Sequence, residues 1–460
     1  KKILWHTLAF MAFSTVWGFG NVINGFSEYG GLRAIVSWIL IFAIYFVPYA
    51  LMVGELGSTF KDAGGGVSSW IQETIGPRMA YYAGWTYWVV HMPYISQKPN
   101  STVIAASWAL FQDKRASSMD TTVMQLICLV IFLFAMYLSS KGMGVLKRLS
   151  ALAGSTMFIM SMLFIAMMVA APALTGGTFM TIQWSLKTFI PTFDASFFMG
   201  LSILVFAVGG CEKISPYVNK MKDPSRDFSK GMAALALMVA VTAILGTVAL
   251  GMMFDSSHIP PDLMTNGAYY AFQRLGEYYH VGNFFVIVYA LTNLIGQFSV
   301  MVLSVDAPLR MLLDSADTRF IPRKMFEKNE HGTYVNGHRL VMLIVCVLII
   351  VPAFGIRNVD VLVRWLVKVN SVCMPLRYLW VFVAYIALKK AGDAYHAQYR
   401  FLKGRTAGVL VGVWCFGFTA FACITGIYSD DLFQLVLNIV TPFVLVGLGF
   451  ILPWLAAREN

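Results

Sequence analysis

The sequence predicts an all-α polytopic membrane protein in which two helices are interrupted at membrane depth. Hydrophobic residues occupy 58% of the 460 positions and charged residues only 12%, so the chain cannot cover its apolar surface without lipid. Apolar runs long enough to cross a bilayer recur along the whole length. Two of these runs are broken by glycines, at Gly18-Phe19-Gly20 and at Gly209-Gly210.

Twelve apolar runs have the length of a membrane span, about 20 residues each. They cover residues 5–28, 33–57, 79–111, 121–140, 147–172, 193–217, 231–254, 281–310, 339–356, 361–388, 407–427 and 432–456. We expect a single membrane domain over residues 1–460. The first run carries polar breaks and lacks a small-residue cleavage site, so no cleavable signal peptide is expected.

Lysine and arginine concentrate in the connections that follow spans four, six, eight and ten. By the positive-inside rule, that side and both termini are expected in the cytoplasm. Such connections also explain the net charge of +11; no nucleic acid partner is expected, because no basic stripe with interleaved aromatics stands outside the spans. The cations are Lys141, Lys147, Arg148, Lys220, Lys222, Arg226, Lys230, Arg319, Arg323, Lys324, Lys328, Lys389, Lys390, Arg400, Lys403 and Arg405.

The glycine breaks have a physical meaning in hydrocarbon. Every backbone N–H and C=O there needs an internal partner, so a helix breaks only where the freed groups face protein, water or a ligand. The N–H groups that start a half-helix suit a carboxylate, and the carbonyl of Val16 at the end of the preceding half suits an ammonium. One break alone is also explained by close helix packing. Two breaks about five spans apart predict a transporter with inverted repeats and a site at the midplane.

The second break lies within Phe206-Ala207-Val208-Gly209-Gly210-Cys211-Glu212. Glu212 follows the glycines directly. An acid at membrane depth is costly, and its default interpretation is functional.

Five short motifs occur in a characteristic order. They are the Gly18-Phe19-Gly20 break, Glu55 ahead of Gly64-Gly65-Gly66, Gly76-Pro77, the run from Phe206 to Glu212, and Lys222-Asp223-Pro224-Ser225-Arg226-Asp227. With this spacing the chain resembles the amino acid–polyamine–organocation superfamily, and within it the bacterial glutamate/γ-aminobutyrate antiporter branch. The resemblance implies a LeuT-type fold with 12 transmembrane helices: a 5+5 inverted repeat over about 5–172 and 193–388, discontinuous helices 1 and 6, and peripheral helices 11 and 12 over 407–456.

The resemblance also implies a location in a bacterial inner membrane and a binding site at the two breaks. The amides of Phe19 and Gly20 would hold the α-carboxylate of a substrate. Phe206 takes the place of a gating aromatic that is often tryptophan in relatives. The carbonyls of Val16, Phe206 and Gly209 would hold the α-amine. The further substrate-binding residues of the breaks are Gly18, Ala207 and Gly210.

Span three offers a face for selectivity. Its residues Tyr87, His91, Tyr94 or Ile95, and Lys98 recur at intervals of three and four, so they share one side of a helix. The family's register turns this side toward the substrate. Lys98 is then a partner for an acidic side chain or a proton carrier, and the alternative is a structural ion pair with Asp306 or Glu212. His91 either senses pH or lines the pore through hydrogen bonds.

Spans eight and ten carry further polar residues. In span eight, Asn293, Gln297 and Ser304 lie along one face, and Thr292, Ser299 and Asp306 along another. Periodicity leaves open which face of span eight is inward. The resemblance favours Ser304 near the substrate and Asp306 toward the cytoplasmic exit. The residues that it implies for gating or coupling are Phe206, Glu212, Lys98 and Asp306. In span ten, Arg364 and Lys368 are expected to snorkel to the outer surface. Arg377 lies deeper and is a candidate for a carboxylate contact or an internal ion pair.

The coupling of transport to a driving ion is expected to differ from that of many relatives. These place a lysine in span five about nine residues beyond the arginine that opens it, and counting from Arg148 leads here to Met157. We therefore expect exchange of an amino acid, glutamate-like, for a related amino acid or amine by alternating access. The alternative is proton-coupled symport of a neutral amino acid or amine.

Catalysis, channel activity and cofactor binding find no support in the sequence. The six cysteines lie in apolar runs without CxxC spacing, so neither a disulfide framework nor a metal site is expected. There is no nucleotide-binding GxxxxGK[ST] loop, and no nucleophile is paired with a base at membrane depth. The expected partners are a small amino acid or amine and membrane lipid, without a cofactor.

Overall fold

The computed structural model describes residues 2–63, 66–142, 144–314 and 316–459 as a bundle of helices. Within these ranges, extended pairing is limited to three isolated bridges. Ten helical segments of the described chain are long and apolar enough to cross a membrane. The expectation of an all-helical polytopic membrane protein is thereby confirmed. Gly64 and Gly65 of the motif after Glu55 lie outside the described residues.

The helices follow one another with short connections. The first group is α1 (Trp5–Val16), α2 (Phe19–Glu28), α3 (Ala34–Ile41), α4 (Val47–Thr59), α5 (Val67–Thr74), α6 (Pro77–Val89), α7 (His91–Phe111), α8 (Thr121–Ser140) and α9 (Gly144–Leu174). The second group is α10 (Leu186–Phe189), α11 (Ala195–Val208), α12 (Pro224–Gly251), α13 (Leu263–Tyr278), α14 (Phe284–Leu313), α15 (Val335–Ile350), α16 (Val359–Cys373), α17 (Leu376–Ala391), α18 (Arg405–Gly426), α19 (Leu432–Gly447) and α20 (Ile451–Glu459).

Tighter and wider turns complete the chain. A π-helical stretch, η2 (Phe42–Phe46), joins α3 to α4, and a long 3₁₀ helix, η5 (Cys211–Lys220), follows α11. The short 3₁₀ helices are η1 (Gly31–Arg33), η3 (Lys61–Ala63), η4 (Arg115–Ser118), η6 (Arg323–Phe326), η7 (Val351–Phe354), η8 (Gly392–Ala394) and η9 (Leu448–Phe450).

Several long helices begin at a side chain that caps them. Asp120 accepts hydrogen bonds from the first amides of α8, Asp194 from an amide of α11, and Asp223 from an amide of α12. Asn358 and Asp431 do the same for α16 and α19. These caps satisfy N–H groups that have no partner within the helix, and so fix where each helix starts.

Two of the expected spans consist of shorter pieces. The run 5–28 is divided into α1 and α2, of 12 and 10 residues. The run 79–111 is divided into α6 and α7 at Val90, whose backbone stays helical at φ −68° and ψ −13°. The second piece has 21 residues but includes polar ones such as Lys98 and Asn100. For these reasons the runs 5–28 and 79–111 are not counted among the ten long apolar helical segments.

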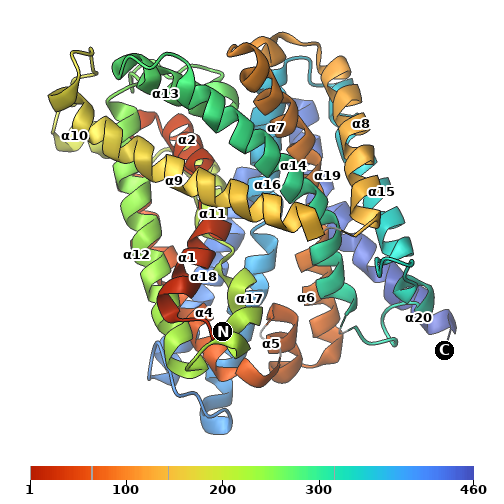
Figure 1. Cartoon of the computed structure of the whole chain (residues 1–460). Helices are drawn as coiled ribbons and strands as arrows, with labels where there is room; N and C mark the ends of the chain where they lie inside the picture. Colours follow the sequence, from red (N-terminus) through yellow and green to blue (C-terminus); the bar gives the residue numbers. More distant parts are fainter. Residues whose placement is uncertain (1, 64–65, 143, 315, 460) are drawn as a thin grey trace.

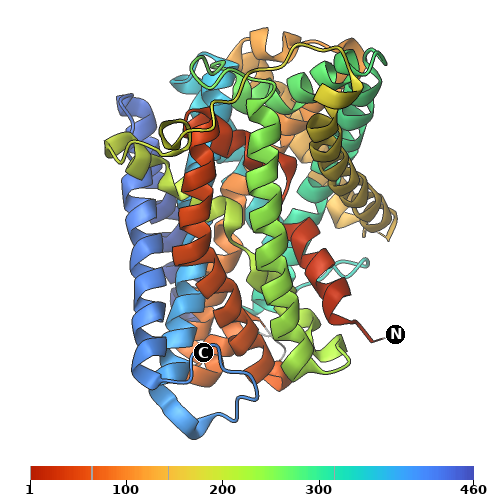
Figure 2. The same ribbon diagram turned by 90° about the vertical axis from the view of Figure 1, so that its left-hand side faces the viewer.

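Figure 1 shows α9 crossing one face of the bundle obliquely, with α12 beside it and α13 lying over one end. Within the bundle, α7 packs along α14, α4 along α12, and α18 against both α11 and α17. In Figures 1 and 2 the chain begins and ends toward the same end of the bundle. The two broken segments, α1–α2 and α11–η5, lie against each other, since α1 contacts η5 and α2 contacts α11; α4 also contacts η5.

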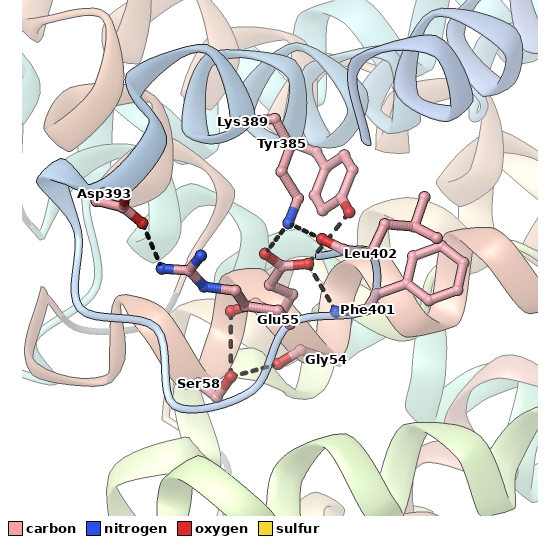
Figure 3. Close-up of polar contacts among 9 residues, drawn as sticks. Gly54, Glu55, Ser58, Tyr385, Lys389, Asp393, Phe401 and Leu402 are labelled. Atoms are coloured by element: carbon pink, nitrogen blue, oxygen red, sulfur yellow. Dashed lines mark hydrogen bonds and ion pairs between the residues drawn. The ribbon is translucent and has the colours of Figure 1, made fainter. Parts of the chain in front are cut away.

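A buried carboxylate ties three segments together near that end (Figure 3). Glu55 of α4 accepts hydrogen bonds from Lys389 of α17 at 2.5 Å, from the Tyr385 hydroxyl at 3.1 Å and from the Phe401 amide at 2.9 Å. Lys389 also donates to the Leu402 carbonyl at 2.7 Å. Both charged side chains are at most 7% exposed. Glu55, noted in the sequence only as part of a motif, is therefore the centre of a buried ion pair that holds the connection after α17 against α4.

Candidate functional site

The first break is formed by Trp17 and Gly18, which are extended between α1 and α2. In a continuous helix the carbonyl of Val16 would receive the N–H of Gly20; the extended residues remove that bond. Phe19 and Gly20 open α2, where N–H groups have no partner within the helix. A Cβ added to Gly18 or Gly20 would meet no heavy atom within 4 Å, so the space beside this break is open.

The second break falls at Gly209 and Gly210. Gly209 is extended and Gly210 takes a left-handed conformation at φ 101°, which a residue with a side chain adopts rarely. The Gly210 N–H would continue α11 by donating to the Phe206 carbonyl, but it donates to the Tyr49 hydroxyl at 3.4 Å. A Cβ on Gly209 would lie 2.0 Å from the ring of Tyr378. These glycines are thus required by the backbone and by the packing of α17.

Glu212, the second residue of η5, forms an ion pair with Arg377 of α17. The Oε1 to Nε distance is 3.4 Å, and both side chains are at most 2% exposed. Neither atom has a hydrogen-bond partner within the described chain, so the pair is held by charge. The other carboxylate oxygen accepts a short hydrogen bond from Tyr49. Of the two readings of Arg377, the structure contains the internal ion pair.

His91 is held in one tautomer by its two contacts. Its Nδ1 lies 2.6 Å from the Tyr87 carbonyl, which can only accept, so Nδ1 carries the proton. Its Nε2 lies 3.4 Å from Nη1 of Arg377, which can only donate, so Nε2 accepts. His91 is thus buried and hydrogen-bonded on both ring nitrogens, and its role, in the pore or as a pH sensor, stays a prediction. The guanidinium of Arg377 also lies 5.2 Å from the ring centre of Tyr87.

Lys98 meets α14 through an amide. Its ammonium donates to Oε1 of Gln297 at 2.9 Å and lies 4.2 Å from the ring centre of Tyr94. Gln297 in turn donates to Asn293 at 3.0 Å. On the face of α14 that carries Asn293, Gln297 and Ser304, Gln297 therefore contacts α7, and Asn293 donates to Tyr269 of α13. Ile95 on the same stretch of α7 is fully buried.

The ion pair considered for Lys98 is wrong for both proposed partners. Asp306 pairs with Arg310, one turn further along α14, at 2.5 Å, and Glu212 pairs with Arg377. Lys368 also departs from expectation: it donates to the Met199 carbonyl of α11 instead of snorkelling outward. Arg364 is exposed, as expected.

Helix α7 connects the two breaks. On one side, His91 reaches the second break through Arg377. On the other, the Lys98–Gln297–Asn293 chain continues to the Tyr269 hydroxyl at 2.8 Å. The ring of Tyr269 packs against that of Tyr289 at 5.3 Å, and Tyr289 lies 6.4 Å from the ring of Phe19 at the first break. The remaining site residues named from the sequence are Val16, Phe206 and Ser304, which are partly buried, and Ala207, which is buried.

The sequence reasoning missed Lys213. It follows Glu212 on η5, is partly buried, and lies close enough to Lys98, Glu212 and Arg377 for their charges to act on it. Its Cε would be 3.8 Å from a Cβ on Gly210. The signal was present in the sequence, since a second charge beside Glu212 in an apolar run is as costly as the first.

A family model described as amino acid permease matches residues 3–457. The chain belongs to the amino acid permease family. The aspartate/glutamate permease AcaP of Lactococcus lactis subsp. cremoris is 49% identical over 472 aligned residues, which cover 100% of this chain and 96% of that protein. This match confirms the superfamily resemblance and makes the chain an amino acid transporter, not an enzyme.

Two relatives with antiporter in their names are more distant. The glutamate/γ-aminobutyrate antiporter of Lactococcus lactis subsp. lactis is 22% identical, over 75% of this permease and 68% of the relative. The probable agmatine/putrescine antiporter AguD of the same subspecies is 24% identical, over 77% and 72%. The permease is a multi-pass membrane protein of a bacterial permease family, and a location in the inner membrane agrees with this family.

Proposed function

We propose that the permease is a secondary active transporter of acidic amino acids such as glutamate and aspartate. This proposal rests on the charge around the second break. Arg377 and Lys98 are the cations that act on Lys213, and the carboxylate that acts on it is Glu212, which already pairs with Arg377. An excess of positive charge in a membrane interior is costly unless an anion offsets it. A dicarboxylic amino acid brings one net negative charge, and AcaP, at 49% identity, is named for aspartate and glutamate.

The substrate would bind along the backbone of both breaks. The free N–H groups of Phe19 and Gly20 suit its α-carboxylate. The carbonyls of Val16, Phe206 and Gly209 suit its α-amine, and the first two lose their helical N–H partners at the breaks. Open space beside Gly18 and Gly20 supports this mode. The side-chain carboxylate would then point toward the cations.

We further propose twelve spans in a LeuT-type fold, with both termini cytoplasmic. Residues 5–172 and 193–388 would form the inverted repeats, and 407–456 the two peripheral helices. The interrupted helices α1–α2 and α11–η5, each opening one repeat, support this assignment. In the alternating-access cycle, α1–α2 and α11–η5 rock against a scaffold of spans three, four, eight and nine, which correspond to α6–α7, α8, α14 and α15. Phe206 and Tyr87 lie at the outer path and Asp306 toward the inner exit.

The proposed mode is exchange for a related amino acid or amine. Met157 stands where many relatives have a coupling lysine, and it cannot carry charge. The antiporter names of two relatives agree with exchange. Proton-coupled symport is the competing mode.

Substrate class is tested by uptake of labelled glutamate into proteoliposomes in the presence of unlabelled competitors. Aspartate is expected to compete strongly, and leucine, lysine and putrescine weakly. Equal competition by neutral or cationic compounds would refute the acidic assignment. A pH gradient that drives uptake into vesicles without any internal amino acid would replace exchange with symport.

A further inference from the structure

Lys213 differs from the other interior cations in having no partner. Arg377 pairs with Glu212, Lys389 with Glu55, and Lys98 donates to Gln297. Within the described residues, the ammonium of Lys213 has neither a hydrogen bond nor an ion pair. Its nearest carboxylate, Glu212, already receives Arg377 on one oxygen and Tyr49 on the other.

The energetic consequence is an unmet demand for an anion. A lysine at membrane depth is expensive unless a carboxylate, a carbonyl or water neutralises or solvates it. Arg377 makes the demand greater, because its guanidinium lies 3.0 Å from the Cβ position of Gly210, the same position that Lys213 approaches at 3.8 Å. The protein supplies one carboxylate for these two cations. A second carboxylate, supplied by a bound ligand, would balance the two cations.

Resting on the proposed function, we propose that Lys213 is the residue that pairs with the side-chain carboxylate of the substrate and so selects acidic over neutral amino acids. It lies three residues beyond Gly210, next to the backbone that would hold the α-amine. Lys98 is the less suitable partner, since it is already bonded to Gln297 and lies over Tyr94. Lys98 stays hydrogen-bonded to Gln297 and attracts the substrate carboxylate from a distance, while Lys213 contacts that carboxylate directly.

The test compares each acid with its amide, which has the same shape and no charge. Full-length wild type and Lys213→Met are purified, and the binding of aspartate, asparagine, glutamate and glutamine is measured as ligand-induced thermal stabilisation. We expect Lys213→Met to bind the acids at least about 30-fold more weakly, as when one partner of a buried charge pair is removed. Binding of the amides should be unchanged or tighter. Because binding is measured directly, a variant that cannot complete the transport cycle is still scored.

Two variants serve as controls. Lys213→Arg keeps the charge and should keep the preference for acids. Lys220→Met makes the same substitution at an exposed position of η5, where the lysine lies over the ring of Tyr217, and should bind like wild type. An unchanged acid-to-amide ratio in folded Lys213→Met overturns the assignment of Lys213 alone. A wild type that does not prefer acids overturns the proposed function instead.

Discussion

Arg377 and Glu212 form an ion pair at 3.4 Å with both side chains almost fully withdrawn from solvent. The pair links the chain just after the second helix break to α17. Through the contacts of Arg377 with His91 and of Glu212 with Tyr49, it also reaches α7 and α4. Four segments are thus joined at the point where α11 is interrupted. The ion pair of Arg377 and Glu212 can therefore fix the position of the second break relative to the helices around it.

Removing Arg377 is expected to cost more stability than removing the whole pair. Arg377→Met leaves the buried Glu212 carboxylate without its guanidinium partner, and breaking a buried pair in this way costs about 3–5 kcal/mol. The double variant Arg377→Met/Glu212→Gln should recover much of that stability, because the buried carboxylate is removed together with its guanidinium partner. Thermal melting of the purified proteins in detergent measures both. A double variant less stable than Arg377→Met would contradict this account.

The Glu55–Lys389 pair makes a similar prediction with a neighbouring control. Lys389→Met should leave Glu55 unpaired and lower the melting temperature, together with the yield of folded protein. The adjacent Lys390 is exposed, and Lys390→Met should melt like wild type, since exposed charges contribute little. Equal melting of the two variants would show that the contacts in Figure 3 do not stabilise the connection after α17.

The glycines of the two breaks are expected to respond differently to substitution. Gly20→Val should fold, because its side chain would enter open space, but should lose substrate binding by filling the space beside the Phe19 and Gly20 amides. Gly209→Ala should reduce folded yield, since the new Cβ would lie 2.0 Å from the ring of Tyr378. Size-exclusion profiles and labelled-glutamate binding separate these effects. Retained affinity in Gly20→Val would reject the carboxylate cradle.

Much of this arrangement follows from local sequence. Glycine pairs in apolar runs predicted both breaks, and a period of three to four placed Tyr87, His91 and Lys98 on one face. Partners were harder to predict, because the pairs of Glu55 with Lys389 and of Glu212 with Arg377 join residues more than 160 positions apart. Which face of α14 turns toward α7 could not be predicted from periodicity, because it depends on the contact between Gln297 and Lys98. The 3₁₀ form of η5 was also not predicted.

Lys98 offers a test of the α7 face. Lys98→Met should leave the protein folded, since its partner Gln297 keeps Asn293, and should reduce glutamate transport at least about tenfold by removing positive charge near the substrate. Lys98→Arg should retain part of the activity. Initial rates in proteoliposomes, corrected for the amount of protein inserted, give the comparison. Wild-type rates in Lys98→Met would remove Lys98 from the transport path.

Counterflow distinguishes exchange of acidic amino acids from the other modes of transport. Proteoliposomes are preloaded with unlabelled glutamate, aspartate, γ-aminobutyrate, leucine, lysine or nothing, and uptake of labelled glutamate is followed at acid and neutral pH. We expect rapid uptake with glutamate, aspartate or a related amine inside, and little uptake into empty vesicles. Uptake that is equally fast into empty vesicles, or that is accelerated best by leucine or lysine, would contradict it.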